Sequence, residues 1–168
     1  MSKKTRVIAF AIFVGIFLLA YTIGTYYKMS DDDARKFLKE FHGTTKGIGA
    51  MGIFLHNSSV ALPMFVPGFG PAWGAFSGWQ TGAGFRVLEI ENPQLAEVPA
   101  VVIFLSSPFG VMELVAYCIG MSRGYLLAWS LVRHRTVKSQ LIPAAIEIGI
   151  VLGLLLIGGL VEYSTISH

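Results

Sequence analysis

The sequence predicts an all-helical, polytopic membrane protein whose residues 1–168 form a single membrane domain. Its composition supports this, because 54% of the residues are hydrophobic and only 14% are charged, whereas soluble domains are usually about a quarter charged. Five apolar stretches are each long enough to cross a bilayer as a helix. The longest is interrupted by Pro108 and Gly110, which predict a break. We therefore expect about five transmembrane helices, one short amphipathic surface helix and one helix broken at Pro108–Gly110.

The first predicted span covers residues 7–27 and follows an amino-terminal segment that carries Lys3, Lys4 and Arg6. A cleaved signal peptide is the alternative, but the apolar run is too long for one and no small-residue cleavage site follows it. The polar segment after the span predicts a helix over 31–42 that lies on the membrane surface. Docking of its apolar face on a partner protein is the alternative.

The second and third predicted spans cover residues 47–66 and 71–88 and are joined by a tight turn over 67–71. Glycines recur every four residues along the turn and the third span, which places them on one face of a helix. Such a face allows a second backbone to approach closely, within the chain or in another subunit. These glycines are Gly70, Gly74, Gly78 and Gly82.

The fourth predicted span lies in residues 98–132, which would form a straight helix about 52 Å long, too long to cross the bilayer upright. A break near 106–110 resolves this in one of two ways. Either a half-helix over 99–106 precedes a span from 110 to about 131, or a kinked span ends near Arg123. After the break, small residues share one helix face with a carboxylate, which predicts that the carboxylate points into a helix contact. This face comprises Gly110, Glu113, Tyr117, Gly120 and Gly124.

The last predicted span covers residues 140–161 and follows a basic loop. Gly149 and Gly153 give it a second ridge of small residues, and we expect Glu147 and Glu162 to reach the headgroups. With five spans, the amino terminus and the basic loop lie on one side of the membrane. The bias in lysine and arginine makes that side cytoplasmic, and we expect a multi-pass protein of the plasma membrane.

An intramembrane polar cluster is the candidate functional site. A carboxylate such as Glu113 near the middle of a bilayer costs about 3 kcal/mol unless it is paired, protonated or hydrated, so the sequence predicts polar partners for it. Hydrogen bonding that locks helices together is one interpretation, and a proton or ion site is the other. The candidate cluster comprises His56, Asn57, Gln80, Ser107, Pro108, Gly110 and Glu113.

Several function classes find no support in the sequence. We find no catalytic set of serine, histidine and aspartate, and no phosphate-binding loop, because the glycines lie in apolar helices. No cluster of cysteine and histidine has the spacing of a metal site. We therefore expect no enzymatic activity, no cofactor, no metal and no nucleic-acid partner. The expected partners are the lipid bilayer and a second copy of the chain.

Two segments resemble one known family. Residues 54–61 (FLHNSSVA), the glycine-rich span after them and residues 107–114 (SPFGVMEL) are together similar to the stage II sporulation protein M family. Phe109 stands where that family usually has histidine, and Ser58 where it often has a second asparagine. The resemblance implies a membrane scaffold that positions partner proteins, including ones that remodel the cell wall. The alternative is a small oligomeric transporter or channel that uses the broken helix and Glu113.

Overall fold

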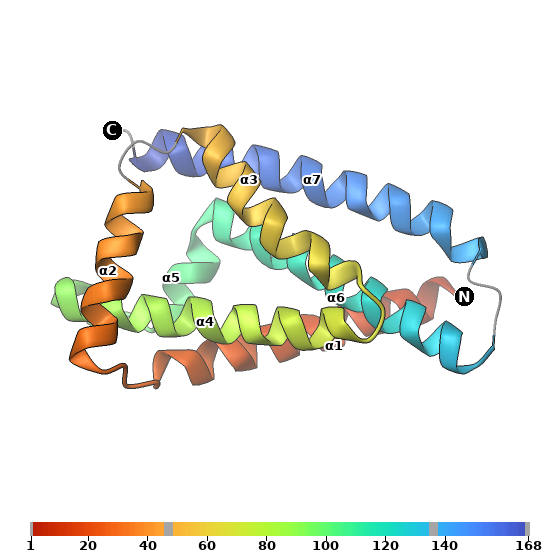
Figure 1. Ribbon diagram of the computed structural model, residues 1–168, viewed down its shortest axis with the longest axis horizontal. Helices are drawn as coiled ribbons and strands as arrows, with labels where there is room; N and C mark the ends of the chain where they lie inside the picture. The colour runs from red at the N-terminus through yellow and green to blue at the C-terminus, as the bar shows by residue number, and fades with distance from the viewer. Residues whose placement is uncertain (1, 46–48, 135–137, 167–168) are drawn as a thin grey trace.

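The computed structural model describes residues 2–45, 49–134 and 138–166, and every regular element in these ranges is helical. The helices form one elongated bundle in which α1 and α4 lie side by side and α6 runs between them and the α3–α7 side (Figure 1). The elements are α1 (Lys3–Thr25), α2 (Asp31–Thr45), α3 (Ala50–Ala61), η1 (Leu62–Phe65), α4 (Phe69–Glu91), η2 (Pro93–Glu97), α5 (Ala100–Ser106), α6 (Pro108–Val132) and α7 (Lys138–Ile166).

Three of these helices are long and apolar enough to cross a membrane, namely α1, α6 and α7. They correspond to the first, fourth and fifth predicted spans, and their length and composition are those of membrane-spanning helices. The predicted total of five is not reached on this criterion. α3 has only 12 residues, and the last turns of α4 carry the charged residues Arg86, Glu89 and Glu91.

The second predicted span differs from a single straight helix. Its first residues, 47 and 48, lie outside the described part of the chain. The α-helix α3 ends at Ala61, and the chain tightens into the 3₁₀ turn η1, which contains Pro63. A proline lacks the N–H that would continue the α-helical ladder, which favours this change.

The turn predicted over 67–71 is shorter than expected, because α4 already begins at Phe69. Gly68 has φ +80°, a left-handed conformation that glycine adopts without steric cost. The third predicted residue of the turn is therefore the first residue of a helix, and Pro71 lies in its first turn, where its missing N–H is tolerated.

The glycine face of α4 packs within the chain. A Cβ on Gly70 would collide with the carbonyl of Met64 in η1, and one on Gly82 with the carbonyl of Tyr21 in α1. The Cβ of an alanine at Gly78 would come 3.0 Å from the carbonyl oxygen of Phe17. All four glycines of this face are buried, including Gly74, which faces α6 through Met121. Close backbone approach thus fixes α4 on α1, η1 and α6.

Helix α6 is the central element, and glycines also bring it close to η1. Gly120 and Gly124 are buried, and a Cβ on either would press on Met64. The predicted ridge on the last span behaves differently, because Gly149 and Gly153 of α7 are exposed and nothing lies within 4 Å of an added Cβ. These two glycines therefore do not pack on another described helix of this chain, and a contact with a second copy of the chain stays a prediction.

The helix break lies at Ser107, inside the interval 106–110 where the sequence predicts it. α5 ends at Ser106 and α6 begins at Pro108, which matches the predicted half-helix followed by a full span rather than a kinked span ending near Arg123. The half-helix packs on Tyr21 of α1, whose hydroxyl donates a 3.2 Å hydrogen bond to the carbonyl of Ala100. Tyr21 is only 1% exposed, so it belongs to the core.

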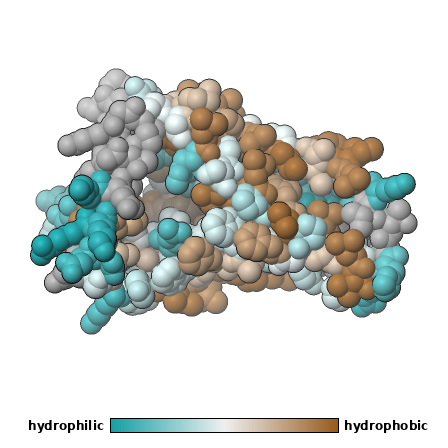
Figure 2. Space-filling model, in the orientation of Figure 1, coloured by the Kyte–Doolittle hydropathy of each residue, from teal (hydrophilic) through white to brown (hydrophobic). Residues whose placement is uncertain are grey.

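Helix α2 projects from one end of the bundle and is strongly charged (Figures 1 and 2). It meets α4 through Phe37, whose ring atom Cζ would lie 2.6 Å from a Cβ on Gly84. Phe37 and Leu38 are half-buried, and the charged side chains around them are exposed. The amphipathic helix predicted over 31–42 is thus present and extends to Thr45. The exposed charged residues are Asp32, Asp33, Arg35, Lys36 and Lys39.

Candidate functional site

The first polar centre joins α3 to α6. The side-chain amide of Asn57 donates a 2.6 Å hydrogen bond to Oε1 of Glu113, and Asn57 is 8% exposed. Glu162 near the end of α7 lies close enough to interact electrostatically with Glu113. This centre therefore brings together two carboxyl groups and an amide from three helices.

The helix break supports this centre from the amino-terminal end of α6. Ser107 caps the helix: its Oγ accepts a 3.2 Å hydrogen bond from the backbone N–H of Gly110 and donates a 2.8 Å bond to the carbonyl of Phe104. Pro108 occupies the first helical position, where its fixed φ favours the helix and its missing N–H costs nothing. The absence of a side chain at Gly110 leaves room for Ser107 and for the carbonyl of Phe104.

Two residues of the predicted cluster lie outside it. His56 and Gln80 are exposed, and neither side chain makes a hydrogen bond or ion pair that places it at Glu113. His56 precedes Asn57 on α3, and consecutive residues on a helix point about 100° apart. A helix that turns Asn57 toward α6 must therefore turn His56 away. The structure thus brings Asn57 to Glu113 and leaves the side chains of His56 and Gln80 exposed, while a functional role for the cluster stays a prediction.

The second polar centre is an ion pair between α6 and α7. Nε of Arg123 lies 2.5 Å from Oε2 of Glu147, and Nη2 lies 2.6 Å from Oε1. Nη1 donates a third bond, of 3.1 Å, to Gln140. Arg123 is 1% exposed. Such a two-pronged contact is the strong form of an ion pair, because both N–H groups of the fork meet both oxygens.

A second arginine reaches the same carboxylate. Nη2 of Arg6, in the first turns of α1, forms an ion pair with Oε1 of Glu147. The side chain of Glu147 is only 14% exposed. Glu147 thus ties α1, α6 and α7 together, and the expectation that it lies at the level of the headgroups stays a prediction.

The sequence contains a signal for this second centre. Arg123 and Glu147 are opposite charges in apolar stretches, and each lies equally far along the chain from position 135, in the loop that joins them. A short loop makes α6 and α7 antiparallel neighbours, which brings residues equidistant from the loop to the same level. Considering Arg123 only as the end of a kinked span conceals this match.

Neither centre resembles a hydrolytic or metal site. Among the described residues, no three histidine, cysteine, aspartate or glutamate side chains lie together as metal ligands would. Cys118 is a free thiol, fully buried in α6. The arrangement can hold helices together by hydrogen bonds and ion pairs, and the Glu113 centre can also hold a proton. Comparison with known proteins finds no family, no curated protein and no solved structure that matches this chain.

Proposed function

We propose that this protein is a non-enzymatic membrane scaffold that positions partner proteins at the membrane. The observation that carries the proposal is that the charged side chains inside the bundle are bound by other side chains of the same bundle. Arg123 is held by Glu147 and Gln140, and Glu113 accepts a hydrogen bond from Asn57. Groups bound in this way join helices, and they leave little polar surface inside the bundle for a substrate.

The proposed topology has five crossings with the amino terminus in the cytoplasm. It adds the α3–η1 segment and α4 to the three long apolar helices. α4 packs along α1 through Gly78 and Gly82, and α3 packs along α7 at Gly159. Helices that lie against transmembrane helices in this way share their environment, which supports a common membrane location. Fusions of a reporter enzyme after Gly68 and after Glu91 would test the crossing by α4, since five crossings place these positions on opposite sides and three crossings place them on the same side.

The proposed partner surface is α2. Its charged side chains face outward at one end of the molecule, whereas apolar residues cover much of the side of the bundle (Figure 2). The resemblance of residues 54–61 and 107–114 to stage II sporulation protein M suggests envelope proteins, including enzymes of the cell wall, as the partners. A charged, exposed helix anchored by one aromatic contact at Gly84 suits such docking.

Crosslinking in native membranes tests this proposal. A photoreactive amino acid in place of Lys36 should capture a defined set of proteins, which mass spectrometry then identifies. The matched control replaces Ile146, an exposed apolar residue of α7, and should capture lipid or other membrane proteins but not the same set. If the two positions capture identical proteins, α2 has no partner-binding role.

A small transporter or channel is the second candidate, and the Glu113 centre favours it. Glu113 and Glu162 are two carboxyl groups close to a broken helix, an arrangement that membrane proteins use to handle protons or cations. Proton or sodium flux into proteoliposomes containing the purified protein tests this. If the protein conducts a flux and Glu113→Gln abolishes it, the transporter replaces the scaffold as the proposed function. If the flux does not exceed that of empty liposomes, the scaffold proposal is supported.

A further inference from the structure

A groove of about 490 Å³ opens between α1 and α7 and has α6 as its floor. α1 and α7 each pack on α6, but among the described residues they make little contact with each other. The lining residues follow helical spacing on each element, with Lys3, Arg6 and Phe10 from α1 and Ser122 and Leu126 from α6. The groove is therefore formed by the faces that these helices turn toward one another.

The charge of the groove is unbalanced. Lys3, Arg6 and Arg123 contribute three positive charges, and Glu147 contributes one negative charge. Glu147 already pairs with both arginines, so one carboxylate is shared by two guanidinium groups. The positive charge in excess lies at the exposed Lys3 and the partly exposed Arg6, where it attracts an anionic headgroup. Guanidinium groups bind phosphate oxygens well, because their N–H donors match the spacing of two such oxygens.

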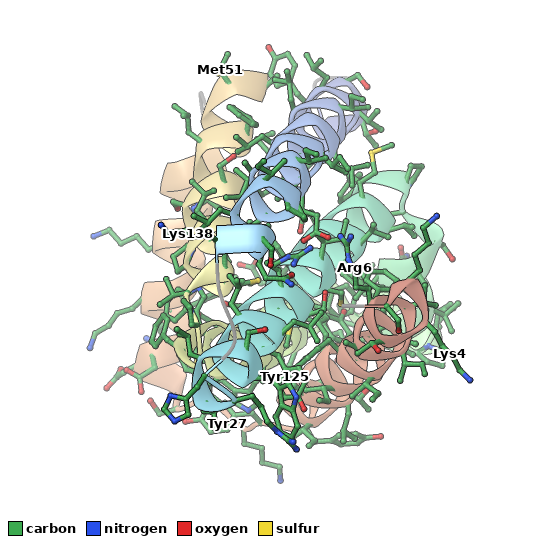
Figure 3. All side chains as sticks on the ribbon, turned by 90° about the vertical axis from the view of Figure 1, so that its right-hand side faces the viewer. Lys4, Arg6, Tyr27, Met51, Tyr125 and Lys138 are labelled. Atoms are coloured by element: carbon green, nitrogen blue, oxygen red, sulfur yellow. The ribbon has the colours of Figure 1, made fainter. Side chains whose placement is uncertain are left out.

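The groove also has an apolar part that continues from the charged end. Val7 and Ile150 stand at its rim and are exposed, and Leu126 lies in its floor. Figure 3 shows Arg6 where α1 approaches α6 and α7, whereas Lys4 points away from them. A ligand that fills this space needs an anionic end beside Lys3 and Arg6 and an apolar end along Val7 and Ile150.

We propose that this groove binds an anionic phospholipid, with its phosphate at Arg6 and Lys3 and its acyl chains along the apolar rim. The lipid comes from the leaflet in which α1 begins. Two features select this ligand over a soluble anion: the groove opens toward the apolar side of the bundle, where Val7 and Ile150 are exposed, and basic pockets between transmembrane helices bind anionic headgroups. This inference does not depend on the proposed scaffold function.

Native mass spectrometry of the full chain in neutral detergent tests the proposal. Phosphatidylglycerol should bind about 25-fold more tightly than phosphatidylcholine, because Arg6 and Lys3 each contribute about fivefold to the affinity for an anionic headgroup. Arg6→Gln should lower the affinity for phosphatidylglycerol about fivefold and leave phosphatidylcholine unchanged. Lys4→Gln is the matched control, since it removes the same charge from the outward side of the same helical turn, and it should have no effect.

The following outcomes would overturn the proposal. Equal binding of the two lipids by the wild-type chain removes the anionic site, and equal loss in Arg6→Gln and Lys4→Gln removes its location. Glycerol 3-phosphate that competes as well as the lipid would assign the groove to a soluble phosphate. Arg6→Lys, which keeps the charge, should retain the preference. If Arg6→Gln does not fold, Lys3→Gln at the exposed rim provides the same comparison, with a drop of about fivefold expected.

Discussion

The two polar centres on α6 differ in how strongly they are built. At Glu113 one amide, from Asn57, meets one carboxylate oxygen. At Arg123 a guanidinium group binds both oxygens of Glu147 and also Gln140. The first centre lies beside a helix break, and the second lies inside an unbroken helix. The comparison indicates that the Arg123 centre contributes more to the free energy of unfolding. The Glu113 centre holds α3 on α6 and contributes less.

The largest expected effect is the loss of Arg123. Arg123→Leu leaves Glu147 with only the half-exposed Arg6 as its partner, and breaking a buried ion pair on one side costs about 3 kcal/mol or more. Equilibrium unfolding in mixed micelles, followed by circular dichroism, measures this loss. The matched control is Arg133→Leu, since Arg133 is exposed and stacks on Trp129 with its guanidinium carbon 4.6 Å from the ring centre. Its loss should change stability far less.

The double variant Arg123→Leu with Glu147→Leu sharpens this prediction. Replacing both partners by apolar residues removes the unpaired charge, and such replacements are often neutral in other proteins. Most of the stability lost in the single variant should therefore return. A double variant as unstable as Arg123→Leu alone would show that the pair acts through something other than its charges.

Gly110→Ala gives the next largest effect and tests the packing at the helix break beside the Glu113 centre. The new methyl group would come within 2.5 Å of the carbonyl oxygen of Phe104 and would also press on Oγ of Ser107. Overpacking of this kind costs about 2 kcal/mol. Gly153→Ala is the control, because nothing lies within 4 Å of its Cβ, and it should be neutral or slightly stabilising through its better helix propensity. Similar losses in the two variants would contradict the close approach at the break.

Ser107→Ala should have a smaller effect. It removes the side chain that caps α6 at the backbone N–H of Gly110, and loss of an N-cap costs about 1 kcal/mol. Thermal unfolding in detergent measures the change, with Ser106→Ala as the control, since Ser106 is exposed and ends α5. Ser107→Thr, which keeps a hydroxyl that can accept from Gly110 and donate to Phe104, should keep most of the stability. A loss in Ser107→Thr as large as in Ser107→Ala would argue against capping.

The smallest expected effect is the coupling of Asn57 to Glu113. A double-mutant cycle with alanine at both positions should give about 0.6 kcal/mol, the average for hydrogen bonds between transmembrane helices. The same cycle at Arg123 and Glu147 should give a clearly larger value. Couplings in the reverse order would invert the comparison between the two centres.

Local signals made parts of the structure predictable. The break at Ser107 follows from Pro108, and the packing face of α4 follows from the four-residue spacing of its glycines. The contact of Asn57 with Glu113 follows from the need of a carboxylate in an apolar helix for a partner. In each case a single stretch of sequence carries the physical constraint.

Other features depend on how helices are oriented and could not be predicted in this way. Asn57 is buried and His56 is exposed because of the face that α3 turns toward α6. The short apolar sequence of α3 does not specify which face that is. The exposure of Gly149 and Gly153 depends on which face of α7 meets α6 and α3. To predict the pairing of Arg123 with Glu147, α6 and α7 must first be recognised as antiparallel neighbours.

Access of water to the interior tests the central claim that these polar groups hold helices together instead of lining a path. Ser58 is 6% exposed and neighbours Asn57, so Ser58→Cys, in a background of Cys118→Ser, probes the centre without removing its hydrogen bond. An aqueous thiol reagent applied to both sides of native membranes should leave this cysteine unlabelled, while Ser30→Cys at an exposed position reacts. Labelling of Ser58→Cys at a rate similar to Ser30→Cys would contradict the account.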